Sequence, residues 1–96
     1  MNDQTEFYKK LLSDEGFKHV FVWHDDPGEV YELHAHKDKV ALYVIEGEIT
    51  LTFEDGDAQT VSKNERINVP VGKIHTAKAG SSGCDFVVGE MIEGDS

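Results

Sequence analysis

The chain has 96 residues, which is the size of one domain, because a single hydrophobic core usually serves about 100 to 150 residues. It carries 9 Lys and Arg against 19 Asp and Glu, and the resulting net charge of -10 excludes nucleic acid and anionic membranes as favoured partners. Charged residues at positions 37–39 interrupt the apolar stretches well before the roughly 20 residues that a membrane span needs.

The N-terminal residues and the cysteine content favour a reducing compartment. Residues 1–4 lack the basic and apolar regions of a secretory signal, and the single cysteine, Cys84, has no partner for an internal disulfide. No basic residue lies beside Cys84, so we expect a buried, unreactive thiol. The sequence therefore predicts a cytoplasmic protein.

The first predicted element is a short helix that ends at Gly16. Asp3 is expected to cap it, with Glu6 three residues later as an approximate capping box, and apolar residues recur at spacings of four after Glu6. Glycine is the usual residue just beyond a helix C-terminus. We expect residues 1–16 to form an N-terminal helical segment and residues 17–96 to form a single β domain.

Beyond Gly16 the pattern changes to short segments rich in β-branched and aromatic residues. The clearest segment alternates strictly and is predicted to bury Ile49, Leu51 and Phe53. With no crossover helices between them, these strands predict an all-β sandwich or barrel, and periodicity alone does not choose between the two. Seven or eight strands are expected, seven of them at residues 17–23, 30–36, 40–46, 48–54, 66–71, 74–79 and 85–92.

Turn sequences are expected to separate these strands. Asp55-Gly56 suits a tight hairpin turn with positive φ. The other expected breaks are residues 26–28, 46–47, 71–72 and 80–83. We also expect Trp23, Phe53 and Phe86 to lie in the core.

Three of the five histidines form a pattern typical of metal ligands. His34 and His36 are two residues apart on a predicted strand, where alternate side chains share a face, and His75 follows on a later strand. Neutral imidazole is a strong ligand for zinc, iron, nickel and copper, and three imidazoles leave coordination positions open. His19 and His24 are expected to be exposed or hydrogen-bonded and to have no part in the site.

The spacing around the three histidines resembles the two sequence motifs of the cupin superfamily. The pattern G-x5-H-x-H-x10-G begins at Gly28 and is similar to the first motif, G-x5-H-x-H-x3-4-E-x6-G, and P-x-G-x2-H begins at Pro70 and is similar to the end of the second. The resemblance implies a small antiparallel jelly-roll barrel. It also implies one divalent metal ion (Fe, Zn, Ni, Cu or Mn) held by His34, His36 and His75, a small-molecule ligand inside the barrel, and a homodimer.

The departures from the family pattern leave the site open to two interpretations. The family's glutamate ligand falls at Val40, the glycine of the second motif at Asn64, and its closing asparagine at Ala79. In the first interpretation the site is a neutral three-histidine metal site, of the kind that some dioxygenases in the superfamily use for ferrous iron. In the second, no metal binds and the histidines line an apolar ligand pocket. Glu32 shares the face of the first two histidines and is an alternative fourth ligand, whereas Asp38 lies in a charged loop.

Three classes of function follow from these alternatives. A metal-dependent oxygenase or isomerase needs the metal and a cavity, a binding or sensing module needs the cavity alone, and a mainly structural dimer needs neither. The segment 17–23 is apolar on both faces and suits a dimer contact. The sequence assigns neither catalytic residues nor a substrate.

Overall fold

The computed structural model describes residues 3–34, 39–69 and 71–91, except for the side chains of residues 3 and 32–34. No helix within these ranges is both long enough and apolar enough to cross a membrane. One helix precedes six strands along the described chain. They are α1 (Asp3–Asp14), β1 (His19–Asp25), β2 (Val30–His34), β3 (Lys39–Phe53), β4 (Ala58–Ser62), β5 (Arg66–Val69) and β6 (His75–Met91).

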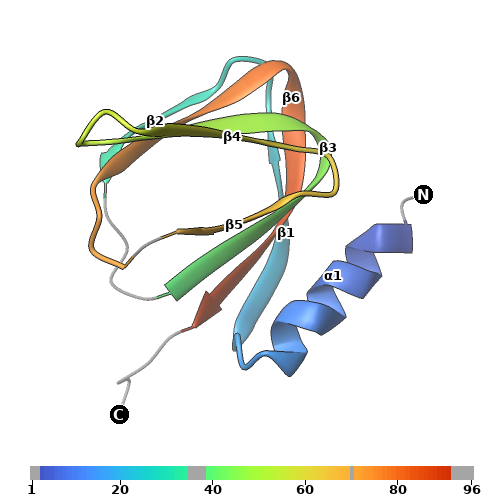
Figure 1. The fold of residues 1–96 in the computed structure, drawn as a ribbon. Coiled ribbons are helices and arrows are strands. Elements are labelled where there is room, and N and C mark those ends of the chain that lie inside the picture. Colours follow the sequence, from blue (N-terminus) through green and yellow to red (C-terminus); the bar gives the residue numbers. More distant parts are fainter. Residues whose placement is uncertain (1–2, 35–38, 70, 92–96) are drawn as a thin grey trace.

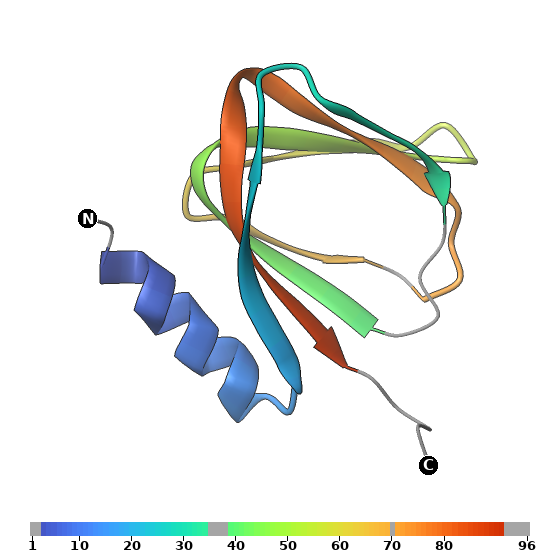
Figure 2. The same cartoon turned by 180° about the vertical axis from the view of Figure 1, so that it is seen from behind.

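The described strands form an antiparallel jelly-roll barrel, as the sequence predicts (Figures 1 and 2). The two long strands β3 and β6 pair from Lys39 opposite Met91 to Phe53 opposite His75, and both bend along their length. The first half of β3 and the second half of β6 are flanked by β5 and β1, and their other halves by β4 and β2. The two long strands therefore contribute to both layers of the barrel.

Two of the expected breaks are wrong, because the chain bends there without leaving the sheet. The predicted strands on either side of residues 46–47 are one strand, β3, and those on either side of residues 80–83 are one strand, β6. Gly47 has a φ of +78° and Gly83 a φ of +83°, and the pairing register of β3 and β6 shifts around Gly47. A glycine in such a bulge has the same sequence signature as a glycine in a turn, which is why the pattern predicted turns.

The strand β4 was missed because its sequence is mostly polar. Of its residues only Val61 is buried, and β4 pairs with β3 through a ladder whose outer side chains face solvent. The tight turn predicted at Asp55-Gly56 is confirmed, and it joins β3 to β4. Gly56 has a φ of +96°, and its N–H donates to the carbonyl of Phe53 at 2.9 Å.

The first half of β3 is buried on both faces because it separates two apolar clusters. Its inward side chains join the barrel core, and its outward side chains, including Ala41 and Ile45, lie under α1. The predicted burial of Ile49, Leu51 and Phe53 is confirmed, since these side chains are 1–6% exposed. The cluster beneath α1 contains Tyr8, Leu12, Phe17, Ala41, Ile45 and Val87.

The helix ends where the sequence predicts. Gly16 has a φ of +104°, its N–H donates to the carbonyl of Ser13, and the N–H of Phe17 donates to the carbonyl of Leu12, each at 3.1 Å. These two bonds form a Schellman motif, which satisfies the last carbonyls of the helix. The motif turns the chain from α1 directly into the segment leading to β1.

Tyr43 and Arg66 fix α1 to the outside of the barrel. Tyr43 stacks on Tyr8 with ring centroids 4.2 Å apart, and the Arg66 guanidinium lies 5.2 Å from the centre of the Tyr43 ring. Arg66 also donates two hydrogen bonds of 2.8 Å to the carboxylate of Glu15, which lower the pKa of that carboxyl group. Tyr43 is therefore part of the helix contact on the barrel's outer face.

Candidate functional site

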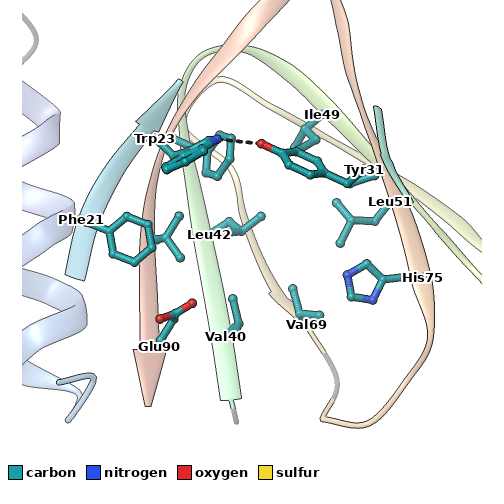
Figure 3. A pocket seen from close by; sticks show the side chains of 13 residues that line it. Phe21, Trp23, Tyr31, Val40, Leu42, Ile49, Leu51, Val69, His75 and Glu90 are labelled. Carbon is teal, nitrogen blue, oxygen red and sulfur yellow. Dashed lines mark hydrogen bonds between the residues drawn. The ribbon is translucent and has the colours of Figure 1, made fainter. Parts of the chain in front are cut away.

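The barrel contains a cavity of about 260 Å³ (Figure 3). Its wall is mainly apolar and aromatic. Among the described residues, the ionisable side chains in the wall are those of Tyr31, His75 and Glu90. The lining residues are Phe21, Trp23, Tyr31, Val40, Leu42, Ile49, Leu51, Val69, His75, Ala77, Phe86, Val88 and Glu90.

Strand register explains why one side of this cavity combines three strands. Directly paired residues of an antiparallel sheet share a face, so every second residue of β1, β6 and β3 points inward here. The resulting rows are Trp23 with Phe86, Phe21 with Val88 and Leu42, and Glu90 with Val40.

The apolar run in β1 is divided between the cavity and the helix. Phe21 and Trp23 line the cavity and remain 36% and 47% exposed, while Val20 packs against the cluster under α1. The predicted core position is confirmed for Phe53 and Phe86, which are buried, but is wrong for Trp23. Trp23 stands on an edge strand, where the wall of the cavity meets solvent.

A buried carboxylate fixes the aromatic end of the cavity. Asp25 is fully buried, and its Oδ1 accepts hydrogen bonds from the Trp23 indole N–H at 2.9 Å and from the Tyr31 hydroxyl. The indole N–H also lies 2.7 Å from the Tyr31 oxygen. Burial, together with the hydrogen bond to Asp25, raises the pKa of Tyr31 to about 12, so its hydroxyl stays protonated at neutral pH. No pattern in the sequence indicates this network, because Asp25 precedes a turn and looks like a turn residue.

Cys84 lies opposite Asp25 in the sheet and is buried, as predicted. Burial, and then the nearby carboxylates of Asp25, Asp85 and Glu48, raise the pKa of its thiol to about 12. Because the thiolate is the reactive form of cysteine, this side chain is inert near neutral pH.

His75 is held in the cavity wall in an orientation suited to metal binding. Its side chain is 2% exposed, and its Nδ1 donates to the carbonyl of Lys73 at 3.0 Å. This tautomer places the ring lone pair on Nε2, which is the usual arrangement of a metal-ligating histidine. The backbone register makes His34 the direct partner of His75 across β2 and β6.

The remaining predicted ligands lie outside the described side chains. His36 and Asp38 fall in residues that the structure does not describe, and of His34 and Glu32 only the backbone is described. Among the side chains that are described, no three His, Cys, Asp or Glu residues lie together in a group able to hold a metal ion. The backbone register therefore brings His34 and His75 together, and the metal site itself stays a prediction.

Two of the positions that depart from the family pattern are described by the structure in detail. Val40, at the position of the missing glutamate, is 5% exposed and faces the cavity. Asn64 has a φ of +70° and is the one non-glycine residue with positive φ in the described chain. Asparagine tolerates this region better than most residues, which explains how it stands at a glycine position. Its Oδ1 also accepts a hydrogen bond from the Tyr8 hydroxyl at 3.2 Å.

Glu90 is a cavity residue that the sequence did not indicate. It is the direct partner of Val40 in the sheet and is partly buried. Figure 3 shows Glu90 and His75 on opposite sides of the cavity, with Val40 and Val69 between them. Glu90 and His75 are thus two polar side chains on opposite sides of the cavity. Only the pairing of β6 with both β1 and β3 reveals that Glu90 faces inward.

The other two histidines are exposed, as predicted, and neither lines the cavity. His19 is exposed, and His24 is an exposed side chain that interacts with the carboxylates of Asp85 and Asp26. The pKa of His24 is raised, mainly by its hydrogen bond to Asp85.

A family model described as "Cupin domain" matches residues 21–88. The chain belongs to the cupin family. No curated protein matches this cupin, whereas many solved structures do. It is 25% identical to a protein of Neisseria meningitidis, with a TM-score of 0.68 over 76% of this chain and 72% of that one.

Two enzymes are also among the structures that resemble this cupin. Oxalate decarboxylase from Bacillus subtilis is 27% identical, with a TM-score of 0.66 over 74% of this chain but only 20% of the enzyme, and a second structure of that enzyme concerns its Mn(II) centres. DMSP lyase from Ruegeria pomeroyi is 16% identical, with a TM-score of 0.69 over 80% of this chain and 39% of the lyase, and supports the fold alone. This cupin therefore spans a minor part of each enzyme.

Proposed function

We propose that this cupin binds a small molecule at a divalent metal ion held inside the barrel by His34, His36 and His75. The observation that carries the proposal is the buried His75 ring, which the Lys73 carbonyl orients and whose strand partner is His34. The Mn(II) centres of oxalate decarboxylase support the choice of a metal, because that enzyme shares this fold.

The residues present fit a neutral site rather than the family's standard one. Val40 places an isopropyl group where the family has a carboxylate, so three imidazoles would be the protein ligands and the metal would keep its full positive charge. Such an ion supplies open coordination positions that bind and polarise a ligand atom, the chemistry that an oxygenase or isomerase needs. The surrounding apolar side chains exclude water and hold the ligand against this end of the cavity.

Metal analysis of protein purified without an affinity tag or chelator tests the proposal. We expect close to one metal ion per chain in the wild type and at least about a tenfold loss of affinity in His75→Ala, because one of three strong ligands is removed. His24→Ala is the matched control, since His24 is exposed and lies outside the cavity wall. A wild-type protein without metal, or a folded His75→Ala variant with full occupancy, would contradict the three-histidine site.

Binding without metal is the second candidate, and the cavity itself favours it. A mainly apolar wall with few polar groups is sufficient to hold a small ligand. Protein that is free of metal and still binds ligands in the cavity would support this alternative. The only tryptophan of the chain, Trp23, lines the cavity and reports occupancy through its fluorescence.

A homodimer through the edge of β1 is a further part of the proposal. Within the described chain β1 pairs with β6 alone, which leaves its other edge without a strand partner, and Val22 on its outer face is 47% exposed. A second copy of the chain would cover this apolar edge.

A further inference from the structure

We infer that the ligand of this cavity is a small organic cation, whose positive group is held between the Glu90 carboxylate and the aromatic rings of Phe21 and Trp23. The inference rests on the proposed function in that it uses the same cavity. It concerns the end of the cavity away from His75, and it can be tested on protein without metal.

The charges that line the cavity favour a cationic ligand. Glu90 is the only carboxylate in the wall, and no lysine or arginine side chain lines it among the described residues. Glu90 is partly removed from water, so a cation facing it would be attracted, whereas an anionic ligand would be repelled by the same carboxylate. The net charge of -10 adds to this preference by attracting cations to the protein as a whole.

An aromatic surface begins beside Glu90 at Phe21 and continues to Trp23. Phe21 is the strand partner of Val88, and His19 that of Glu90, so Phe21 and Glu90 are diagonal neighbours on the inward face of the sheet. Phe21 and Trp23 meet edge to face, with centroids 6.5 Å apart and planes at 79°. Aromatic faces attract ammonium groups, most strongly when the cation is removed from water.

The hydrogen bonds of Trp23 add to its suitability for a cation. Its indole N–H is already engaged by Asp25 and lies next to the Tyr31 hydroxyl, so the ring offers its faces rather than its N–H to a ligand. A ligand with a cationic end is therefore favoured over a neutral one of the same shape.

The size and the shape of the cavity limit the ligand further. A volume of about 260 Å³ is below the roughly 300 to 1,000 Å³ of pockets for drug-sized ligands, so the ligand has few heavy atoms. Because Glu90 and His75 face each other across the cavity, the cationic end is kept away from the proposed metal (Figure 3). The ligand class is thus a short molecule with an amine or alkylated ammonium group at one end.

Three probes of the same shape test the inference on metal-free protein. They are choline, the neutral 3,3-dimethylbutan-1-ol and the anionic 3,3-dimethylbutanoate, each titrated by calorimetry and by the fluorescence of Trp23. We expect choline to bind at least about tenfold more tightly than the alcohol, and the anion to bind most weakly. Glu90→Gln should lose about tenfold in affinity for choline and none for the alcohol. Glu48→Gln, an exposed glutamate that does not line the cavity, is the matched control.

Several outcomes overturn the inference. The inference is wrong if the alcohol or the anion binds as tightly as choline, or if choline does not bind at all. It is also wrong if Glu90→Gln binds choline as tightly as the wild type does. A loss of metal rather than choline in Glu90→Gln would make Glu90 a metal ligand instead. Thermal unfolding followed by circular dichroism checks that Glu90→Gln is folded, and Glu90→Asp, which keeps the charge, should retain the preference for choline over the alcohol. Failure of the metal analysis leaves these results standing, so the two proposals are tested separately.

Discussion

Gly47→Ala is expected to destabilise the barrel more than a glycine replacement at an ordinary turn. Gly47 has a φ of +78°, a conformation that costs an L-residue about 1–2 kcal/mol. A Cβ atom at this position would also lie 3.0 Å from the carbonyl carbon of Gly83, 3.2 Å from Cα of Cys84, and closer still to the Gly83 carbonyl oxygen. All three atoms belong to the backbone of β6, so none of them can move aside by a change of rotamer.

Gly56→Ala separates the conformational cost from the clash. Gly56 has a φ of +96°, but a Cβ atom there meets nothing within 4 Å. We expect this control to lose about 1 kcal/mol of unfolding free energy, which is the cost of the backbone conformation. In Gly47→Ala the displaced β6 backbone adds to that cost, for a total of about 3–5 kcal/mol. Such a loss is a large fraction of the roughly 5–15 kcal/mol that stabilises a domain.

Urea unfolding followed by far-UV circular dichroism measures both variants under the same conditions. The difference in unfolding free energy between Gly47→Ala and Gly56→Ala isolates the contact between the two bends of the long strands. A difference of less than about 1 kcal/mol would refute the reasoning, because the β6 backbone would then yield at little cost. A Gly47→Ala variant that does not fold, beside a folded Gly56→Ala variant, would be the extreme form of the expected result.

Two further predictions concern the cavity end and the β1 edge. Because the pKa of Tyr31 is raised from 10 to about 12, the folded state disfavours tyrosinate, so stability is complete below pH 10 and falls as the pH rises toward 12. Tyr31→Phe should flatten that fall in urea unfolding between pH 9 and 11, and an unchanged slope would show that Tyr31 titrates normally. For the edge, light scattering at micromolar concentration should give the mass of a dimer, and Val22→Glu should yield the monomer by placing a charge in the apolar contact. A wild-type monomer would exclude this dimer.

The sequence predicted the fold correctly in those segments where the residue pattern is compatible with a single local structure. Strict alternation correctly predicted the burial of Ile49, Leu51 and Phe53, and Gly16 correctly predicted the end of the helix. Both signals depend only on residues that are close in the sequence. The bend at Gly47 could not be distinguished from a turn by sequence, because a glycine with positive φ occurs in both. Only the pairing with β6 on both sides of Gly47 shows that the strand continues. Local patterns therefore placed the elements but not the bulges within them.

The candidate site was predictable from spacing only in part. The spacing of the histidine motifs indicated His75 and the inward position of Val40, because those residues recur at fixed positions in the family. Glu90 and Asp25 carry no such spacing, and each acquires its place from a strand that is distant in the sequence. Which carboxylates face a cavity depends on long-range register, which no local pattern encodes.

The pairing of β1 with β6 determines the order in which the barrel can be completed. Trp23 pairs with Phe86, 63 positions further along the chain (86 - 23), whereas Phe53 pairs with His75 after only 22 (75 - 53). The ends of β3 and β6 that lie closest in sequence can pair early, because a shorter loop loses less entropy on closing. During synthesis β1 cannot pair with β6 until residues 84–90 have left the ribosome. The aromatic wall of the cavity, which includes Phe21 and Trp23 of β1, therefore cannot form before then. The cavity is thus the last region of the barrel to close, and Phe21 and Trp23 must remain in contact with water until then.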